Sequence, residues 1–487
     1  MKTPFYITTT LPYVNAPLHM GHALEFVRAD AVARYKTLQG FDVFFNTGTD
    51  EHGQKIYTKA LEATLTPQQF VDKGFDTFKT QVASFGVTDE VHYIRTTDEH
   101  HVAAAQEFWK RVYDNGYIYK KTYEAKYCVG CESEKTDSEL VDGACPLHPG
   151  TELEIINEEN YFFKYSAFQE KLLAFYEANP TFIIPEFRFN EIKSFVEGGL
   201  QDFSISRIKE KMAWGVPVPG DDSQVMYVWF DALVNYISTL GWPNNDKSFE
   251  RYWMNGTPVQ YCGKDNTRFQ GAMWQAMLMA ADVPNSHQIV VNGFITADGG
   301  VRMSKTLGNV IDPLGISNEY GVDVLRFFLL REITSFEDSP FTEERFRDSY
   351  QANLANGLGN LVSRIMKMVV NYEVSYTLPT DEDLLEFDDA VPEGFKEKIE
   401  SFDLKNAMDD IWREVTGLDW LIQNKEPFKL AKTDMGGAQA IVAELATRLY
   451  IIGFLLQPFM PSTAETIMNL VKEKKMPETP LFARLEE

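Results

Sequence analysis

The sequence is poor in cysteine and histidine and has no long apolar run. Its 487 residues include only 4 Cys and 8 His. No uninterrupted apolar run approaches the ~20 residues that a membrane-spanning helix needs. The first residues also lack the charged and apolar regions of a secretory signal. We therefore expect a cytoplasmic protein that does not enter a membrane.

Positive charge is also scarce. Lys and Arg total 46 against 71 Asp and Glu, so the formal net charge is −25. A phosphate backbone attracts Lys and Arg, so the bulk charge argues against a nucleic-acid partner. The net charge does not exclude a nucleic-acid partner, because an acidic protein can carry a local basic strip that binds phosphate. We interpret most of the acidic residues as a solvated surface that keeps the protein soluble.

What is present is the composition of a soluble globular protein. Hydrophobic residues make up 44% and charged residues 24% of the chain. At roughly 100–200 residues per domain, the length predicts two to four domains.

The N-terminal region reads as the start of a parallel α/β sheet. Residues 5–10 are aromatic and β-branched, which predicts a buried strand. Apolar residues recur at helical spacing from Leu24 to Tyr35, and a second apolar run follows at 43–45. Strand, helix and strand in this order are typical of a parallel sheet, whose ligands bind at the carboxyl ends of the strands.

The pattern of apolar and polar residues changes twice more along the chain. Between about 115 and 224, cysteines and short polar stretches replace the regular alternation, which indicates an insertion. The α/β pattern resumes with apolar runs at 225–230, 259–262 and 289–291, which we interpret as strands. After about residue 346, apolar faces at helical spacing predict a helix bundle. We expect five segments: a Rossmann-like parallel-sheet domain in two halves (1–115 and 225–295), the insertion (116–224), a linking region (296–345) and an α-helical domain (346–487).

The first motif with chemical meaning is His19-Met20-Gly21-His22, where a proline-containing loop meets a helix. A helix N-terminus attracts phosphate through its free N–H groups and its dipole. Two histidines there can stabilise an oxyanion developing on phosphorus. Taken alone, two histidines near a helix start are more often capping or surface groups, or half of a metal site.

A second motif follows some 280 residues later. Residues 302–309, after Gly299-Gly300, form a glycine-flanked loop with two cations, and such a loop can close over a polyphosphate. Lys305 can neutralise pyrophosphate as it leaves. The alternative is a solvated basic turn.

Three of the four cysteines fall within 18 residues, and a histidine follows them. Cys128-x2-Cys131, thirteen residues, and Cys145-x2-His148 supply two close pairs of ligands. In a cytosolic protein this spacing predicts one tetrahedral, structural zinc site with all four positions filled. A redox dithiol at Cys128 and Cys131 is the rival, but it leaves Cys145 and His148 without a role.

Together the two phosphate motifs resemble the HIGH and KMSKS elements of class I aminoacyl-tRNA synthetases. Segments 47–56, 202–207, 214–217, 228–233 and 261–265 resemble, in order, the bacterial methionyl members of that family. The resemblance runs from residue 5 to about 465. It implies activation of L-methionine by ATP to methionyl-adenylate, then transfer to tRNA(Met), including initiator tRNA, with AMP and pyrophosphate as products.

The resemblance also implies site residues. By this resemblance, the residues that stabilise the transition state are His19, His22 and Lys305. ATP, with its Mg²⁺, is held by Glu25, Gly263, Asp265, Met303 and Lys305. The methionine pocket comprises Leu11, Tyr13, Asp50, Trp229, Ala232, Tyr236, Asn266 and Gln270, with Asp50 on the substrate ammonium. The zinc knuckle lies in the connective insertion, the region 296–345 carries the KMSKS loop and stem contacts, and the bundle reads the anticodon through Asn360, Arg364 and Phe428.

Three positions depart from the family pattern. Gln270 stands where the family commonly has histidine, Asn266 where it often has an aliphatic residue, and Phe428 where it has a stacking tryptophan. Phenylalanine still offers a ring face for an unstacked base. A more polar methionine pocket leaves open altered amino-acid specificity as an alternative function.

Two further rivals remain. A nucleotidyl transferase of the same superfamily shares the histidine motif but has a short chain. A non-catalytic tRNA-binding paralogue should have lost parts of the ATP site, yet His19, His22, Asp265 and Lys305 are all present. No C-terminal tRNA-binding extension follows the bundle, so we expect a monomer.

Overall fold

The computed structural model describes residues 2–131, 133–135, 139–148, 150–244, 247–300, 311–386 and 392–485. These residues form two compact units. The first draws on residues 1–18, 42–81 and 89–291, and the second on 19–41, 82–88 and 292–487. Met303 and Lys305 lie outside the described residues.

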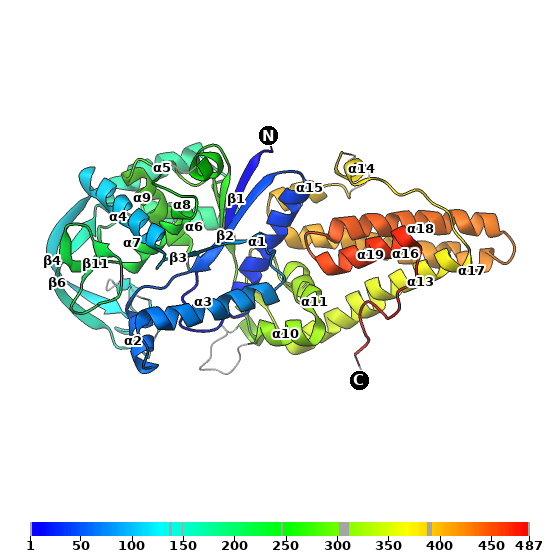
Figure 1. The fold of residues 1–487 in the computed structure, drawn as a ribbon, viewed down its shortest axis with the longest axis horizontal. Coiled ribbons are helices and arrows are strands. Elements are labelled where there is room, and N and C mark those ends of the chain that lie inside the picture. The colour runs from blue at the N-terminus through cyan, green and yellow to red at the C-terminus, as the bar shows by residue number, and fades with distance from the viewer. Residues whose placement is uncertain are drawn as a thin grey trace. The chain divides into compact units, whose positions relative to one another are not determined.

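A six-stranded sheet organises the first unit (Figure 1). Its strand order is β3-β2-β1-β12-β13-β7, and β1 pairs in parallel with both β2 and β12. The strands are β1 (Pro4–Thr8), β2 (Asp42–Thr49), β3 (His92–Arg95), β7 (Ile183–Ile184), β12 (Pro258–Gly263) and β13 (Gln288–Asn292). In chain order, β1 to β3 run outward on one side of β1, and the later strands β7, β12 and β13 all lie on its other side. The point where the order reverses therefore lies between β1 and β12.

Helices complete this unit around an aromatic core. They are α2 (Gln54–Glu62), α3 (Pro67–Ser84), α4 (Glu99–Asp114), α7 (Val228–Ala232), α8 (Asn235–Ser238) and α9 (Trp274–Ala280), with the π-helical turns η3 (Phe249–Met254) and η4 (Phe269–Met273). In the core, the Phe108 ring lies 6.0 Å from that of Phe230 and 5.7 Å from that of Trp274. Large aromatic side chains bury much apolar area, which makes this cluster a main source of stability.

The insertion forms two antiparallel sheets within the first unit. One has the order β5-β4-β6-β8 and the other β10-β11-β9. Their strands are β4 (Ile118–Cys128), β5 (Ser133–Lys135), β6 (Glu154–Phe163), β8 (Phe203–Ser204), β9 (Ser206–Ile208), β10 (Pro217–Val218) and β11 (Asp221–Met226). Helices α5 (Gln169–Ala178) and α6 (Glu186–Glu197) lie between β6 and β8 in the sequence.

One predicted strand is wrong. Residues 225–230 were expected to resume the parallel sheet, but Val225 and Met226 end β11 of the antiparallel insertion, and α7 begins at Val228. A short, continuous apolar run has no period, so a buried strand cannot be told from a buried helix by pattern alone.

The second unit is largely helical, as the sequence predicts after residue 346. Helices α13 (Asn360–Asn371), α16 (Leu404–Lys425), α18 (Met435–Leu456) and α19 (Pro461–Glu473) pack along one another, with α18 in contact with the other three (Figure 1). The unit also contains α1 (Met20–Leu38), α10 (Pro313–Tyr320), α11 (Val322–Phe327), α12 (Glu343–Ser349), α14 (Asp381–Glu386), α15 (Phe395–Glu400) and α17 (Pro427–Leu430), with π-helical turns η7 (Phe328–Glu332) and η8 (Tyr350–Gly359). The predicted fold class, a parallel α/β sheet with an insertion and a helical C-terminal region, is confirmed.

Arg28 fastens α1 within the second unit. Its buried guanidinium donates to the backbone carbonyls of Ser335 (2.6 Å), Thr334 (2.7 Å) and Ile333 (3.2 Å), just beyond the end of η7. Backbone carbonyls buried away from water need hydrogen-bond donors, and the guanidinium supplies them to three consecutive residues. This contact holds the middle of α1 in place and, with it, the helix start.

Helix α18 meets the length and hydropathy of a membrane span, with a mean hydropathy of 1.5, although the sequence analysis expected no such stretch. Within the bundle, 56% of that window is buried. A central bundle helix needs apolar residues on several faces, which accounts for its composition.

Candidate functional site

His19 is the N-cap residue of α1, and His22 lies in the first turn of that helix. The Nδ1 atom of His19 accepts the backbone N–H of Gly21 (3.1 Å), and Nδ1 of His22 accepts the backbone N–H of His19 (3.2 Å). An imidazole nitrogen that accepts a hydrogen bond carries no proton, so this network assigns the proton of each neutral ring to Nε2. The two rings stack with their centroids 3.8 Å apart. The capping arrangement thus fixes both tautomers.

The environment keeps His22 neutral. Burial and the neighbouring His19 lower the pKa of His22 well below its ordinary value of 6.5. A neutral imidazole with Nε2–H donates a hydrogen bond at physiological pH, and the helix N-terminus adds its own N–H groups and dipole. This turn is therefore suited to an anionic phosphoryl group. Glu25 follows His22 by three residues on the same helix and is buried.

In the first unit, three loops leave the carboxyl ends of β1, β2 and β12, at the point where the strand order reverses. Open α/β sheets bind their ligands at such switch points. The structure joins two of these loops directly, since the backbone N–H of Asp50 donates to Pro12 O (3.0 Å) and Tyr13 forms a parallel bridge with Asp50. Leu11 and Asp50 are buried and Tyr13 is half-buried. The structure thus brings Tyr13 and Asp50 together.

Trp229 and Ala232 lie on α7, and Tyr236 lies on α8. The Trp229 indole stacks flat on Phe269, with centroids 3.9 Å apart and an interplanar angle of 4°. Its buried Nε1 has no hydrogen-bond partner among the described residues. Tyr236 instead packs in the aromatic core, its ring 5.9 Å from that of Trp274. Of these predicted pocket residues, Tyr236 is the one with a clear packing role.

Four predicted site residues lie at the end of β12 and in the loop and helical turn that follow it. A Cβ on Gly263 would lie 2.8 Å from Asp265 Oδ1, so glycine lets that carboxylate fold back over the chain. The backbone N–H of Asn266 donates to Gly263 O (2.9 Å) and closes the turn. Gln270 is fully buried: its Nε2 donates to Thr10 Oγ1 (2.8 Å), and its Oε1 accepts from Gln260 Nε2 (3.2 Å). The amide of Gln270 is therefore bonded within the protein.

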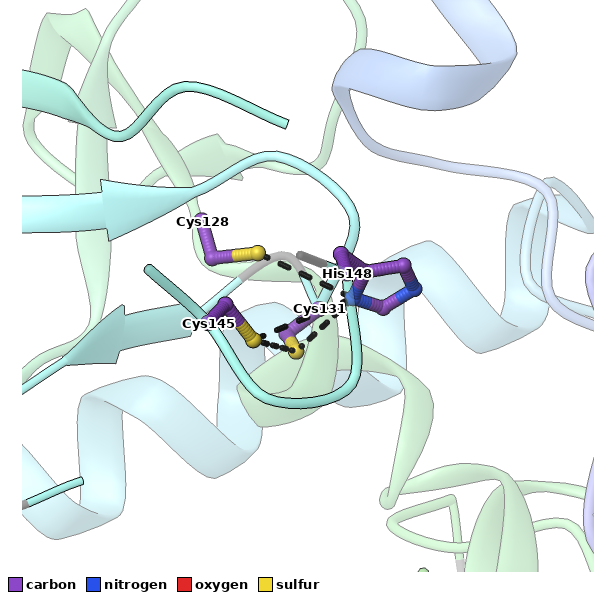
Figure 2. Close-up of side chains that lie close together, drawn as sticks. All are labelled: Cys128, Cys131, Cys145 and His148. Carbon is purple, nitrogen blue, oxygen red and sulfur yellow. Dashed lines mark hydrogen bonds between the residues drawn. The ribbon is translucent and has the colours of Figure 1, made fainter. Parts of the chain in front are cut away.

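The cysteines and histidine of the knuckle converge as their spacing predicts (Figure 2). Their ligand atoms lie within 4.8 Å of one another, with Cys131 Sγ 3.5 Å from Cys145 Sγ and 3.3 Å from His148 Nδ1. A tetrahedral zinc with bonds of about 2.0–2.3 Å separates its ligands by about 3.3–3.8 Å. A Cβ on Gly130 would lie 2.5 Å from the His148 ring, so only glycine lets that ring approach. The four residues fit a zinc ion.

Without a cation, the thiols of this cluster differ in acidity. Burial raises the pKa of Cys131 to about 12. Burial opposes ionisation of Cys145 as well, but backbone N–H groups of Leu147 and His148 hold the pKa of that thiol below its usual value. A divalent cation at the centre deprotonates the thiols that coordinate it.

The predicted anticodon residues lie in the helical unit. Asn360 and Arg364 are one turn apart on α13, and Arg364 pairs through Nη1 with Asp419 on α16. Phe428 on α17 is 45% exposed, so its ring is accessible to a partner. Sequence reasoning missed Asp419 and also Trp420, which is 62% exposed on α16. The sequence shows that a tryptophan stands at this position, but only the structure shows that its side chain is exposed.

Sequence reasoning also missed a buried polar cluster beside the expected pocket. Asp231 accepts hydrogen bonds from His52 (2.7 Å) and His101 (2.9 Å). Lys55 is a second omission: its Nζ lies 5.3 Å from the centroid of the Tyr13 ring and donates to Gly130 O (2.5 Å) in the knuckle. Long sequence separations hide both groups from pattern analysis.

Comparisons with known proteins bear on the whole chain. The family model described as "tRNA synthetases class I (M)" matches residues 5–154 and 147–366. A methionine–tRNA ligase of Caldanaerobacter subterraneus subsp. tengcongensis is 41% identical over 478 residues, which covers 96% of this chain and 74% of the relative. A methionine–tRNA ligase of Brucella suis is 39% identical over 482 residues, which covers 96% and 92%.

Solved structures agree. The methionyl-tRNA synthetase of Mycobacterium tuberculosis in complex with methionyl-adenylate superposes with a TM-score of 0.89 at 37% identity, covering 96% of this chain and 94% of that one. The free form of that enzyme gives a TM-score of 0.84 at 33% identity, covering 100% and 99%.

Proposed function

The chain belongs to the methionine-type class I tRNA synthetases, and from this premise we propose how its residues divide the work. Members of this family activate an amino acid with ATP and charge tRNA, and this chain is a methionine–tRNA ligase of that kind. Methionine, ATP and tRNA are its substrates.

The chemistry determines what the protein must supply. The methionine carboxylate attacks the α-phosphate of ATP in line, the bond to the bridging oxygen breaks, and pyrophosphate leaves. A ribose hydroxyl of the tRNA terminus then takes the aminoacyl group, and AMP leaves. The substrates bring both nucleophiles, so the protein provides positioning and charge stabilisation.

We assign the phosphate chemistry to the start of α1. The observation that carries this assignment is the pair of imidazoles, His19 and His22, whose Nδ1 atoms both accept backbone N–H groups at a helix N-terminus and leave Nε2 as the donor. Two fixed N–H donors stabilise negative charge as it develops on the α-phosphate without themselves needing to lose a proton. Lys305, outside the described residues, is assigned to the departing pyrophosphate.

ATP is held by Glu25, Gly263, Asp265, Met303 and Lys305 in this proposal, and Mg²⁺ accompanies the nucleotide. The exposed carboxylate of Asp265 beside Gly263 is a suitable acceptor for ribose hydroxyls. Hydroxyl donors bind an ionised acceptor more strongly than a neutral one.

The methionine pocket is assigned to Leu11, Tyr13, Asp50, Trp229, Ala232, Tyr236, Asn266 and Gln270. Asp50 is suited to the substrate ammonium, because its backbone is fixed by Pro12 and its carboxylate is buried. Trp229, stacked on Phe269, is suited to the thioether, because sulfur packs favourably against aromatic rings.

We propose one structural zinc per chain, held by Cys128, Cys131, Cys145 and His148. Four protein ligands leave no open position for water, so zinc would contribute folding energy to the insertion and no catalytic group. The knuckle residues in turn keep Gly130 O as the acceptor of Lys55.

The helical unit is assigned to the anticodon of tRNA(Met), of the initiator as well as the elongator species, through Asn360, Arg364 and Phe428. We keep the division into catalytic halves (1–115 and 225–295), insertion (116–224), KMSKS-loop and stem-contact region (296–345) and anticodon domain (346–487) as part of this proposal. It also includes a cytoplasmic monomer that does not bind membranes.

Aminoacylation of three transcripts tests the function. We expect initiator tRNA(Met) and elongator tRNA(Met) to be charged with methionine at comparable kcat/KM. A tRNA of another amino acid with a similar acceptor stem should be charged at least about 1000-fold more slowly. Charging of the elongator alone would restrict the tRNA assignment, and equal charging of all three would refute it.

A further inference from the structure

A fully buried carboxylate lies between two predicted pocket residues on α7. Asp231, at 0% exposure, follows Trp229 by two residues and precedes Ala232. Its Oδ2 accepts from His52 Nδ1 at 2.7 Å, and its Oδ1 accepts from His101 Nε2 at 2.9 Å. Both oxygens are therefore used, each by a different imidazole from a different part of the chain.

The proton positions in this cluster are consistent with an ionised Asp231. Ser238 Oγ lies 2.8 Å from His101 Nδ1, so a serine hydroxyl that donates there leaves the His101 proton on Nε2, facing Asp231. Burial opposes ionisation of Asp231, but the charge of His52 and the hydrogen bonds from both imidazoles hold the pKa of this carboxyl below its usual value. The two hydrogen-bond partners of the carboxylate among the described residues are both imidazole donors.

The cluster ties together elements that are unstable alone. Helix α7 has five residues and α8 has four, well short of the length at which isolated helices form in water. Asp231 fastens α7 to His101 on α4, and His101 fastens α8 through Ser238. The orientation of Trp229 on α7 therefore depends on this network.

The same carboxylate fastens the loop that carries Asp50. His52 follows Asp50 by two residues, so its bond to Asp231 links the loop after β2 to α7. Trp214 also supports the loop: its Nε1 donates to Glu51 O (2.6 Å), and its ring lies edge-on to that of His52, with the centroids 5.5 Å apart. The carboxylate that receives the ammonium and the indole that receives the thioether thus share one buried anchor.

We propose that Asp231, with His52 and His101, is a positioning residue of the methionine site that sets the spacing between Asp50 and Trp229. The inference rests on the pocket assigned above. It goes beyond that assignment because Asp231 touches no substrate: it acts on methionine affinity through the two groups that it anchors, and ATP binding does not depend on it.

The test is the separation of two Michaelis constants in ATP–pyrophosphate exchange. Asp231→Asn keeps the shape but places an N–H₂ group against one of the two imidazoles. We expect the KM for methionine to rise about 10-fold to 100-fold, the cost of misplacing a binding group by about 1 Å. The KM for ATP should stay within twofold, and the Kd for methionine from calorimetry should rise in parallel.

Two further substitutions test whether the KM for methionine depends on the position of the removed group in the network, and they replace Asp231→Asn if that variant misfolds. Ser238→Ala removes the outer end of the network and should raise the KM for methionine less than Asp231→Asn does. His52→Gln removes the link to the Asp50 loop and should raise it more than Ser238→Ala. Should Asp231→Asn be insoluble, these two variants carry the test, and an unchanged KM for methionine in both overturns the proposal.

A matched control separates positioning from general stability. Asp221→Asn is the same substitution in the same unit, at a carboxylate bonded to Lys120 (3.0 Å) and Tyr161 (3.1 Å) in the insertion. It should leave both KM values unchanged. Equal rises in both KM values for Asp231→Asn would indicate a merely structural role and overturn the proposal.

Asp50→Asn distinguishes this inference from the assignment beneath it. If Asp50→Asn leaves the KM for methionine unchanged, the pocket assignment is wrong. If Asp50→Asn raises that KM and Asp231→Asn does not, the pocket stands and only the positioning role is refuted.

Discussion

The guanidinium of Arg326 and the carboxylate of Asp30 form an ion pair, with Nη1 2.7 Å from Oδ2, in which both side chains are fully buried. The pair joins α11 to α1, the helix that begins with the histidine motif. Arg326 also donates to the carbonyls of Phe459 and Pro458, each at 2.8 Å. Thr88 N–H donates to Asp30 Oδ1 (2.8 Å), so both ions are well bonded.

Breaking this pair should destabilise the helical unit. Asp30→Ala leaves a buried guanidinium without its carboxylate, and such losses cost about 3–5 kcal/mol of unfolding free energy. Denaturant unfolding followed by circular dichroism measures the change. Arg34→Ala is the control, because Arg34 bonds the same Asp30 at 2.8 Å but is partly exposed, and it should cost about 1 kcal/mol or less. A loss below about 1 kcal/mol for Asp30→Ala would contradict the structural role of the pair.

Substitution of His22 should reduce turnover more than ATP binding. His22→Asn can still accept the backbone N–H of His19 but loses the Nε2–H donor. Loss of one such donor costs about 100-fold to 1000-fold in kcat. The exchange assay measures kcat and the KM for ATP separately. His287→Asn, a change of an exposed histidine in the other unit, should leave both constants unchanged.

The pH profile tests the charge state of His22. Its pKa lies well below 6.5, so the imidazole is neutral above that lowered value and becomes cationic only as the pH falls through it. The rate of the wild-type enzyme should therefore show no step near pH 6.5 that the His22→Asn variant lacks. Such a step would mean that His22 titrates normally and would refute the neutral-donor account.

Metal removal should unfold the knuckle without touching the catalytic groups. Wild-type protein purified with zinc should contain one zinc per chain by plasma emission, and Cys145→Ser should contain little or none. Chelation should lower the melting temperature of the insertion. Cys262→Ala is the matched control, since Cys262 lies in β12 outside the cluster, and it should keep the metal. Zinc-free wild type from metal-replete cells would contradict the site.

Arg364→Ala should separate the two half-reactions. Amino-acid activation should be unchanged, while the KM for tRNA(Met) in charging should rise by about 10-fold, the loss expected for one good base contact. Arg413→Ala on α16, an exposed arginine that pairs with Asp410, should alter neither. A charging KM that stays at the wild-type value would remove Arg364 from the anticodon site.

The sequence predicted those parts of the molecule in which the pattern is local. The spacing of the cysteines and His148 is a statement about ligands within 21 residues, and the structure brings them together. The apolar repeat from Leu24 to Tyr35 predicted α1, which the structure places at Met20–Leu38. Periodicity and spacing are properties that a single sequence displays directly.

What the sequence could not predict depends on distant pairs. Asp231 meets His52 across 179 residues and His101 across 130, and nothing in the local pattern at 231 indicates either contact. The run 225–230 was assigned to a strand because its side chains are apolar throughout, and its helical half is determined by tertiary packing. Gln270 was noted for its polarity, yet its bonds to Thr10 and Gln260 emerge only in three dimensions.

The bonds of Gln270 bear directly on amino-acid selection. A buried amide without partners would favour a polar substrate, but Gln270 bonds Thr10 and Gln260, and in the proposed pocket the stacked Trp229 and Phe269 form the apolar wall. We therefore expect selection of an unbranched apolar side chain despite the unusual polar residues.

ATP–pyrophosphate exchange with each of the twenty amino acids tests this account most directly. Methionine should support exchange with a kcat/KM at least about 100-fold above that of any other amino acid, the discrimination a shaped apolar pocket can reach. An equal or higher kcat/KM for another amino acid would contradict the central claim that this chain selects and activates methionine.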